Sequence, residues 1–169
     1  MLRLAAATTM AFVLLCAVAV ARTVDVPSRL GAVIPKAHDS GLVVLLPSRM
    51  DLDYRSGGRI YAEGDGDEKL GTYSLELSGA KDCGGANACF LADFLGAKGA
   101  KLGYKTTNVK LALGMRGHYK AQTCGASCSP PSIAWIQKGV RYEIQAKAVG
   151  GRKAFVAMAN SAINAGNRK

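Results

Sequence analysis

The reactive side chains that stand out in this sequence are four cysteines in two close pairs. Cys83 and Cys89 enclose the run CGGANAC, and Cys124 and Cys128 enclose CGASC. Such pairs form disulfides, hold zinc or exchange thiols and disulfides. Structural zinc sites usually separate paired ligands by about two to four residues, and thiol oxidoreductases use CxxC, so the first pair fits neither spacing. Two disulfides are the favoured interpretation, with zinc as the alternative.

Four cysteines allow three different pairings. The local pairing, Cys83 with Cys89 and Cys124 with Cys128, closes rings of seven and five residues. On the loop-entropy account each short ring contributes about 2 kcal/mol, and a long link between the two runs about 4 kcal/mol. Energy therefore favours long links, whereas proximity and the small residues inside each run favour local ones. We expect the local pairing.

The rest of the catalytic inventory is short. His38 and His118 are the only histidines, and no HExxH, GxSxG or P-loop motif occurs. Asp51 and Asp53 lie two residues apart, but the run DLDYRSGG lacks the ligands of a calcium loop, so we expect a solvated turn. Trp135 is interpreted as a core residue, with a carbohydrate-stacking platform as the alternative. We therefore predict no catalytic residue, no cofactor, no metal site, and a protein that is not an enzyme.

The first 21 residues have the pattern of an export signal. Arg3 supplies a positive charge, residues 10–20 are apolar, and Ala19-Val20-Ala21 places a cleavage site before Arg22. An uncleaved membrane anchor is the alternative interpretation of the same segment. We expect residues 1–21 to act as a signal peptide.

Cleavage would leave residues 22–169 as a single secreted domain, long enough to bury a core of its own. Cys16 would leave with the signal, and an even number of cysteines in an exported chain is typical of an oxidising compartment. Lipidation of Cys16 is a further alternative, although Leu15 stands where a lipoprotein signal needs a small residue. We expect a secreted, periplasmic or cell-surface protein whose mature form does not span the membrane.

Charge is divided unevenly along the chain. Residues 22–97 carry 8 Lys/Arg and 11 Asp/Glu, whereas residues 98–169 carry 13 Lys/Arg against one acid, Glu143. A half this basic predicts an anionic partner, although a solvated surface that keeps an exported protein soluble is the alternative. The candidate anion-binding residues are Lys98, Lys101, Lys105, Arg116 and Lys120.

The partners that fit this charge are an anionic envelope polymer or lipid head groups. Nucleic-acid binding normally interleaves aromatic side chains with the basic ones. Here Tyr104, Tyr119 and Tyr142 are the only candidates, and Tyr142 shares the apolar face of its segment. We therefore expect no specific nucleic-acid binding, and the sequence does not determine the oligomeric state.

The clearest elements indicate a sheet followed by a helix. Strands are expected at residues 58–63 and 71–78, joined into a hairpin by the turn formers GDGDEK. Residues 140–148 alternate between apolar and charged side chains, which is typical of an antiparallel sheet with one wet face. Residues 152–164 have apolar side chains at helical spacing, with Gly166 placed as a C-cap. The fold expected is α+β: a twisted, mainly antiparallel sheet of about six to eight strands with a C-terminal helix packed on one face.

Other segments are less decisive. A short strand is expected near residues 32–34, and the apolar run 41–50 is typical of a buried strand. Residues 88–96 fit a strand, with a helix as the alternative. Residues 108–113 alternate in a way that predicts a strand with Leu113 facing the core, paired with the segment that follows it.

Four segments resemble a group of uncharacterised exported bacterial proteins that share a CxGAxAC run, a later CGAxCS run and a closing strand and helix. The segments are LLPSRM (45–50), CGGANACF (83–90), CGASCSPPSIAW (124–135) and GVRYEIQAKAVGGRKAFVAMANSAI (139–163). The C-terminal part also looks like the end of DUF4367-type periplasmic or cell-surface domains. These resemblances imply a location outside the cytoplasm and no known activity.

Together the charge and the export signal predict an exported, non-enzymatic binding or accessory protein of the cell envelope or extracellular space. Its basic C-terminal half is expected to contact the anionic partner. The alternative is a carrier of a small hydrophobic or lipid ligand in a concavity of the sheet. A hydrolase would need a general base that the sequence does not display.

Overall fold

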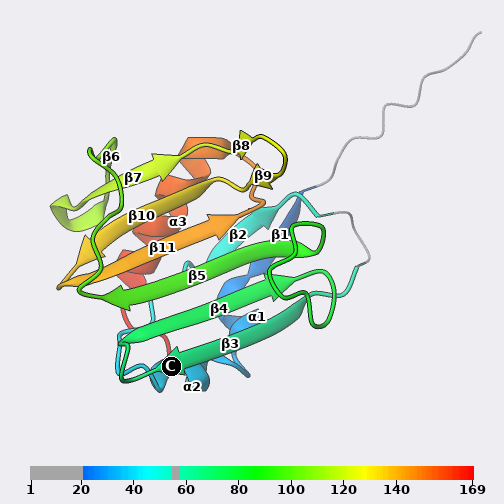
Figure 1. Cartoon of the computed structure of the whole chain (residues 1–169), viewed down its shortest axis with the longest axis horizontal. Helices are drawn as coiled ribbons and strands as arrows, with labels where there is room; N and C mark the ends of the chain where they lie inside the picture. Colours follow the sequence, from blue (N-terminus) through cyan, green and yellow to red (C-terminus); the bar gives the residue numbers. More distant parts are fainter. Residues whose placement is uncertain (1–20, 55–57) are drawn as a thin grey trace, which may run out of the picture.

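The computed structural model describes residues 21–54 and 58–169 and shows an α+β fold (Figure 1). A seven-stranded antiparallel sheet forms its centre, which confirms the predicted class and strand number. The strands of this sheet are β3 (Tyr61–Asp67), β4 (Thr72–Ser78), β5 (Phe90–Lys98), β6 (Val109–Lys110), β7 (Arg116–Lys120), β10 (Ser132–Gln137) and β11 (Val140–Ala146). The expected signal peptide, residues 1–21, falls outside the described residues except for Ala21.

Two short strand pairs and four helical segments complete the described part of the chain. The pairs are β1 (Arg22–Asp25) with β2 (Arg49–Leu52), and β8 (Thr123–Cys124) with β9 (Cys128–Ser129). The helical segments are α1 (Val26–Leu30), α2 (Ile34–His38), the 3-10 helix η1 (Ala112–Gly114) and α3 (Gly151–Ala165).

The order of strands in the sheet differs from their order in the chain. The spatial order is β3-β4-β5-β11-β10-β7-β6. The chain builds β3, β4 and β5 inward from one edge, crosses to β6 at the other edge, and returns inward through β7 and β10. The last strand, β11, then fits between β5 and β10. We call residues 99–108, which connect β5 to β6, the crossing loop.

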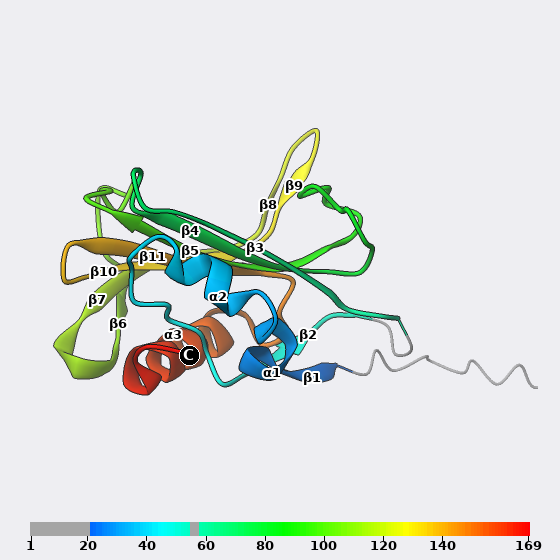
Figure 2. The ribbon, with the colours of Figure 1, turned by 90° about the horizontal axis from the view of Figure 1, so that it is seen from below.

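One face of the sheet is covered by helices and the other is open (Figure 2). Helices α1 and α2 lie against β3 and β4, and α3 lies against β7 and β10. Hairpin β8–β9 rises from the opposite side (Figure 2). In β11, Val140, Tyr142, Ile144 and Ala146 are buried and the intervening residues are partly exposed. The predicted division into one apolar and one wet face is confirmed.

The core lies between the sheet and the helices. Phe94 of β5 lies opposite Leu75 of β4 and Ile144 of β11, and none of the three is more than 1% exposed. Trp135 of β10 is fully buried and stacks on Tyr142, with ring centroids 5.7 Å apart. Each such side chain contributes roughly 1.5–3 kcal/mol by burial, so this layer is a main source of stability. Trp135 is thus a core residue, as predicted.

Helix α3 covers the β7–β10 half of the sheet. Its buried side chains are Phe155, Met158, Ala159, Ala162 and Ile163. The Phe155 ring lies 5.5 Å from that of Tyr119 on β7. Gly166 follows the helix with a φ of 66°, a conformation that glycine adopts without strain. Both the apolar stripe and the C-cap were predicted by the spacing.

Two glycines let α2 approach the backbone of β3. Gly64 and Gly66 take inward positions opposite Leu75 and Tyr73 of β4. A Cβ on Gly66 would lie 2.3 Å from the carbonyl oxygen of Lys36 in α2. The run GDGDEK therefore does not form the hairpin turn as a whole. The strand continues to Asp67, and the turn follows it.

The strand expected near residues 32–34 is wrong. These residues form a turn that leads into α2, and Pro35 occupies the first turn of that helix. Proline lacks the amide hydrogen that residues in a helix interior donate. In the first turn of a helix the amides donate no intrahelical hydrogen bond, so proline is tolerated there. Proline in this region is therefore compatible with helix as well as with extended chain.

The single strand expected over residues 41–50 is also wrong. Residues 41–48 contain one isolated bridge, Leu45 with Asn167, and strand β2 begins only at Arg49. The segment is nevertheless buried, since Val44, Leu45 and Leu46 are at most 2% exposed. A continuous apolar run indicates burial and leaves the hydrogen-bond partners undetermined.

Residues 90–98 form strand β5, so the strand interpretation of that segment is confirmed. The hairpin of β6 with β7 is confirmed as well. The expectation for Leu113 is wrong, because β6 ends at Lys110 and η1 follows it. Leu113 has a φ of 55° and is 77% exposed.

The close approach of α2 to β3 predicts a severe effect of Gly66→Ala. The new methyl group would meet the Lys36 carbonyl, and α2 would have to move away from the sheet. We expect a loss of about 1–3 kcal/mol in the free energy of unfolding, the usual cost of overpacking. Urea unfolding followed by circular dichroism measures it.

Gly125→Ala is the matched control, because a Cβ at Gly125 meets no atom within 4 Å. It should change stability by less than about 0.5 kcal/mol. Equal losses in the two variants would show that the α2–β3 contact is not tight.

Candidate functional site

Basic side chains gather at the end of the sheet where β5 ends. Lys98 is the last residue of β5, and Lys138 lies in the turn between β10 and β11. The amide of Gly99 donates to the carbonyl of Gly139 at 2.8 Å, which holds the two chain segments together. Both lysine side chains are exposed. The pairing of β5 with β11 thus brings two cations together that are 40 residues apart in the sequence.

The crossing loop adds further cations and is fixed on strand β7. The Tyr104 ring stacks on that of His118, with centroids 3.9 Å apart. His118 Nδ1 donates to the carbonyl of Thr106 at 2.6 Å, and Arg116 Nε donates to Thr107 Oγ1 at 2.9 Å. The loop is therefore held in place by side-chain contacts, and its lysines, 101 and 105, remain exposed.

The predicted anion-binding residues lie in two places. Lys98, Lys101 and Lys105 lie at the end of β5 and in the crossing loop, and Arg116 begins β7. Lys120 ends β7, about 13 Å from Arg116 at the usual rise of a strand. We call the first group, with the added Lys138, the basic end. The residues of the basic end are Lys98, Lys101, Lys105, Arg116 and Lys138.

Sequence reasoning missed Lys138. Its only local signal is the turn Gln137-Lys138-Gly139, and nothing in that turn shows which strand lies beside it. The ion pair of Arg141 with Glu143 is the only one among residues 21–54 and 58–169. Within that part of the chain, the cations of the basic end therefore face solvent without a carboxylate partner.

A cleft of about 640 Å³ opens beside Lys98 and Lys138. It lies between the β10–β11 turn, the segment 41–45 and the chain after α3. The β10–β11 turn is at the left end of the sheet in Figure 1. Its volume falls within the range of about 300–1,000 Å³ that is usual for small-molecule sites. Its apolar lining consists of Leu42, Val43, Leu45, Val140 and the ring of Tyr142.

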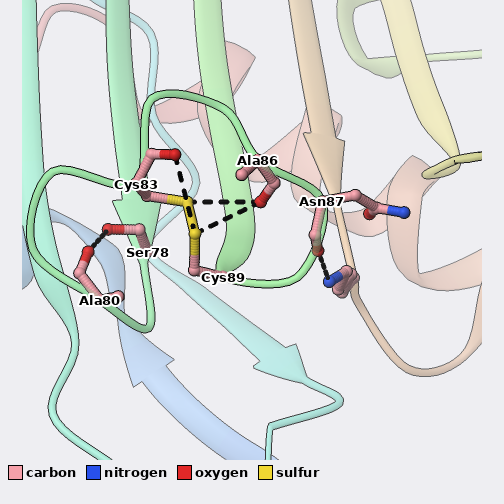
Figure 3. Close-up of a disulfide and its surroundings, with 7 residues drawn as sticks. Ser78, Ala80, Cys83, Ala86, Asn87 and Cys89 are labelled. Carbon is pink, nitrogen blue, oxygen red and sulfur yellow. Dashed lines mark hydrogen bonds between the residues drawn. A yellow bond between two sulfur atoms is a disulfide. The ribbon is translucent and has the colours of Figure 1, made fainter.

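The two disulfides lie at the opposite end of the sheet. The structure pairs Cys83 with Cys89 and Cys124 with Cys128, which confirms the local pairing. In the first ring both sulfur atoms lie 3.4 Å from the carbonyl oxygen of Ala86 (Figure 3). Disulfides of this kind are typical of an oxidising compartment.

A single side chain connects the two disulfide loops. Asn87 Nδ2 donates to the carbonyl of Cys128 at 3.1 Å, and the carbonyl of Asn87 accepts from Lys147 Nζ. Beneath the loops lies a pocket of about 230 Å³, whose sheet residues include Glu76, Asp93 and Gln145. This volume is smaller than that of most small-molecule sites.

The two carboxylates of this pocket are cross-strand neighbours with altered acidity. The pKa of Asp93 is raised to about 6, first by burial and also by Glu143, while hydrogen bonds from Ser74 and the Phe94 amide oppose the rise. The pKa of Glu76 is also raised, first by burial and then by Asp93 and Glu63. Asp93 therefore changes its protonation in the weakly acidic range.

The other residues considered for chemistry have structural partners. His38 Nε2 donates to the carbonyl of Arg168 at 2.7 Å. Of the expected solvated turn, Asp51 lies instead in β2, where it accepts a hydrogen bond from Thr23, and Asp53 is exposed beyond the strand. Residues 55–57 of the same run lie outside the described residues. Among the described residues, no group of three His, Cys, Asp or Glu side chains could hold a metal ion.

No helix in the described part of the chain is long and apolar enough to cross a membrane. No protein-family model matches the sequence, and comparisons with curated proteins and with solved structures found no match. The resemblance of the two cysteine runs to exported bacterial proteins stays a prediction.

The raised pKa of Asp93 predicts that stability falls as pH rises. An aspartate in an unfolded chain has a pKa of about 3.9, so between about pH 4 and pH 6 the folded state binds more protons than the unfolded state. Asp93→Asn removes the buried charge, and Asn can still accept the hydrogen bond from Ser74. At pH 7.5 we expect this variant to be about 1 kcal/mol more stable than the wild type in urea unfolding, because partial solvent contact reduces the full linkage effect.

The advantage of Asp93→Asn should disappear near pH 4. Asp65→Asn is the control, since Asp65 is exposed on β3. It should stay within about 0.5 kcal/mol of the wild type. A stabilisation by Asp93→Asn that is the same at pH 4 and pH 7.5 would contradict the argument.

Proposed function

We propose that this protein is an exported, non-enzymatic binding protein of the cell envelope or extracellular space that contacts an anionic polymer through its basic end. The observation that carries the proposal is the grouping of Lys98, Lys101, Lys105 and Lys138 on neighbouring turns and loops. Among the described residues these side chains have no carboxylate partner. The positive potential of such cations is not neutralised by a neighbouring carboxylate, so they attract polyanions.

The arrangement of strands supports this proposal. The acidic half of the sequence forms β3, β4 and β5, whose open face carries Glu63, Asp65, Glu76 and Asp93. The basic half forms β6, β7, β10 and β11 of the same sheet, the hairpin β8–β9 and the crossing loop. The division of charge along the chain is therefore also a division across the sheet, and the field would direct a polyanion towards the basic half.

The proposed location outside the cytoplasm rests on two features. The two disulfides fit an oxidising compartment. The predicted signal peptide would bring the chain there. Secretion, the periplasm and the cell surface agree equally with both features.

Retention on heparin at about 0.15 M salt tests the proposal, because exposed charges are screened beyond about 8 Å under these conditions. The wild-type protein should be retained. The variant Lys98→Gln/Lys101→Gln/Lys105→Gln should bind more weakly. The slope of log affinity against log salt should fall by about 2 to 3, because fewer counterions are released.

A second triple variant separates a local site from the overall charge. Lys36→Gln/Lys81→Gln/Lys153→Gln removes the same charge from exposed positions on α2, the loop after β4 and the start of α3. It should retain most of the affinity. If both triple variants bind alike, or if the wild type passes through the column, binding at the basic end is excluded. Retention on anionic vesicles in place of heparin would assign the partner to lipid head groups.

A further inference from the structure

We infer that the cleft beside Lys98 and Lys138 binds an amphipathic anion that has one acyl chain and one negatively charged head group. This inference goes beyond contact with a polymer, because the ligand would enter the protein. It also assigns a location to the ligand site of the alternative function, a carrier of a small hydrophobic or lipid ligand. That location is the end of the sheet, next to the segment 41–45, and not a concavity of the sheet surface.

The wall of the cleft is apolar because a segment rich in Leu and Val, residues 41–45, forms it without joining the sheet. The segment 41–45 runs beside β11, and the Tyr142 hydroxyl donates to the carbonyl of Val43 at 3.2 Å. The amide of Val44 donates to Asn167 Oδ1 at 2.9 Å, which connects the segment to the chain after α3. The carbonyl of Val43 and the amide of Val44 thus have partners within the protein, and the side chains of this segment that line the cleft are hydrocarbon.

Val43 shows that this apolar surface is accessible. Its side chain lines the cleft and is 44% exposed, whereas Leu45 and Val140 behind it are buried. Covering such a side chain with an acyl chain would remove apolar area from water, at roughly 25 cal/mol for each Å².

Glycines form two of the turns that line the cleft. Gly99 and Gly139 both have positive φ, a conformation that favours glycine, and a Cβ on either would meet no atom within 4 Å. The space beside both residues is therefore open.

The charge beside the cleft selects the head group. Lys98 and Lys138 are exposed residues of the lining, and the lining contains no Asp or Glu. An apolar wall with cations at one edge is complementary to a hydrocarbon chain that ends in an anion. A neutral lipid would leave the lysines unused, and a small inorganic anion would leave the wall uncovered.

Titration with dodecanoate at about 0.15 M salt and below its micelle concentration tests the inference, with calorimetry as the readout and Trp135 fluorescence as a second one. Dodecanoate should bind at least tenfold more tightly than dodecanol, and acetate at the same concentrations should not bind. Equal affinity for dodecanoate and dodecanol would show that the lysines take no part, and absence of dodecanoate binding would overturn the inference.

Val43→Asp places a negative charge in the apolar wall and should weaken dodecanoate binding at least tenfold. Ile136→Asp is the matched control, because Ile136 is also 44% exposed but does not line the cleft. It should leave the affinity within about twofold. Thermal unfolding of both variants establishes that they are folded, and equal weakening in the two folded variants would contradict the assignment of the cleft.

Two further variants separate this inference from polymer binding. Lys98→Gln/Lys138→Asn should weaken dodecanoate binding at least tenfold and by no more than about 25-fold, since each exposed charge pair contributes up to about fivefold in affinity. Asn is chosen at position 138 because Lys138 has a φ of 51°, which Asn tolerates. Lys101→Gln/Lys105→Gln should weaken retention on heparin and leave dodecanoate affinity unchanged. A wild-type protein that binds dodecanoate but passes through the heparin column would refute polymer binding and leave the cleft assignment intact. A wild-type protein that is retained on heparin but does not bind dodecanoate would do the reverse.

Discussion

The pairing of β11 with β5 is the interaction on which the rest of the molecule depends. It joins seven consecutive residue pairs, from Val140 with Lys98 to Ala146 with Ala92. Without it the chain would consist of two partial sheets, one acidic and one basic. With it, Phe94 and Ile144 meet in the core, and Lys98 comes to lie beside Lys138. The same pairing places Asp93 beside Gln145 at the opposite end, so both candidate sites depend on one ladder of backbone hydrogen bonds.

The burial of one face accounts for the electrostatics of the other. Because the helices and the segment 41–48 cover the inward side of the sheet, the charged side chains of the alternating pattern must share the open face. On the acidic half this brings Glu63, Glu76 and Asp93 into one row across β3, β4 and β5. Where the disulfide loops overhang that row, water is partly removed and the carboxylates hold protons more strongly. At the basic end no such cover exists, and the cations remain hydrated.

Sequence pattern predicted those elements whose partners lie nearby in the chain. The alternation of residues 140–146 and the helical stripe from Phe155 to Ile163 each reflect a single buried face, so both were predictable. The segment 41–48 was not, because its amide partners are Tyr73 and Asn167, far away in the sequence. Gly64 and Gly66 were interpreted as turn residues, although they are required by the distant α2. The lysines of the crossing loop were identified from charge alone, whereas Lys138 needed the β5–β11 pairing.

The local pairing of the cysteines agrees with the way the two halves of the sheet are joined. A cross-link between the two cysteine runs would constrain the unfolded chain more strongly than either short ring. The two halves are already joined by β11, however, and what lacks support is the pair of loops beyond the sheet. Thr123 and Cys124 of β8, for example, are both exposed. A short ring fixes such a loop without a core, and the bond from Asn87 to Cys128 then connects one fixed loop to the other. One end of the sheet is thus held by covalent rings, while the other end keeps glycine turns and an open cleft. This difference in local constraint is what we would expect if binding takes place at the basic end.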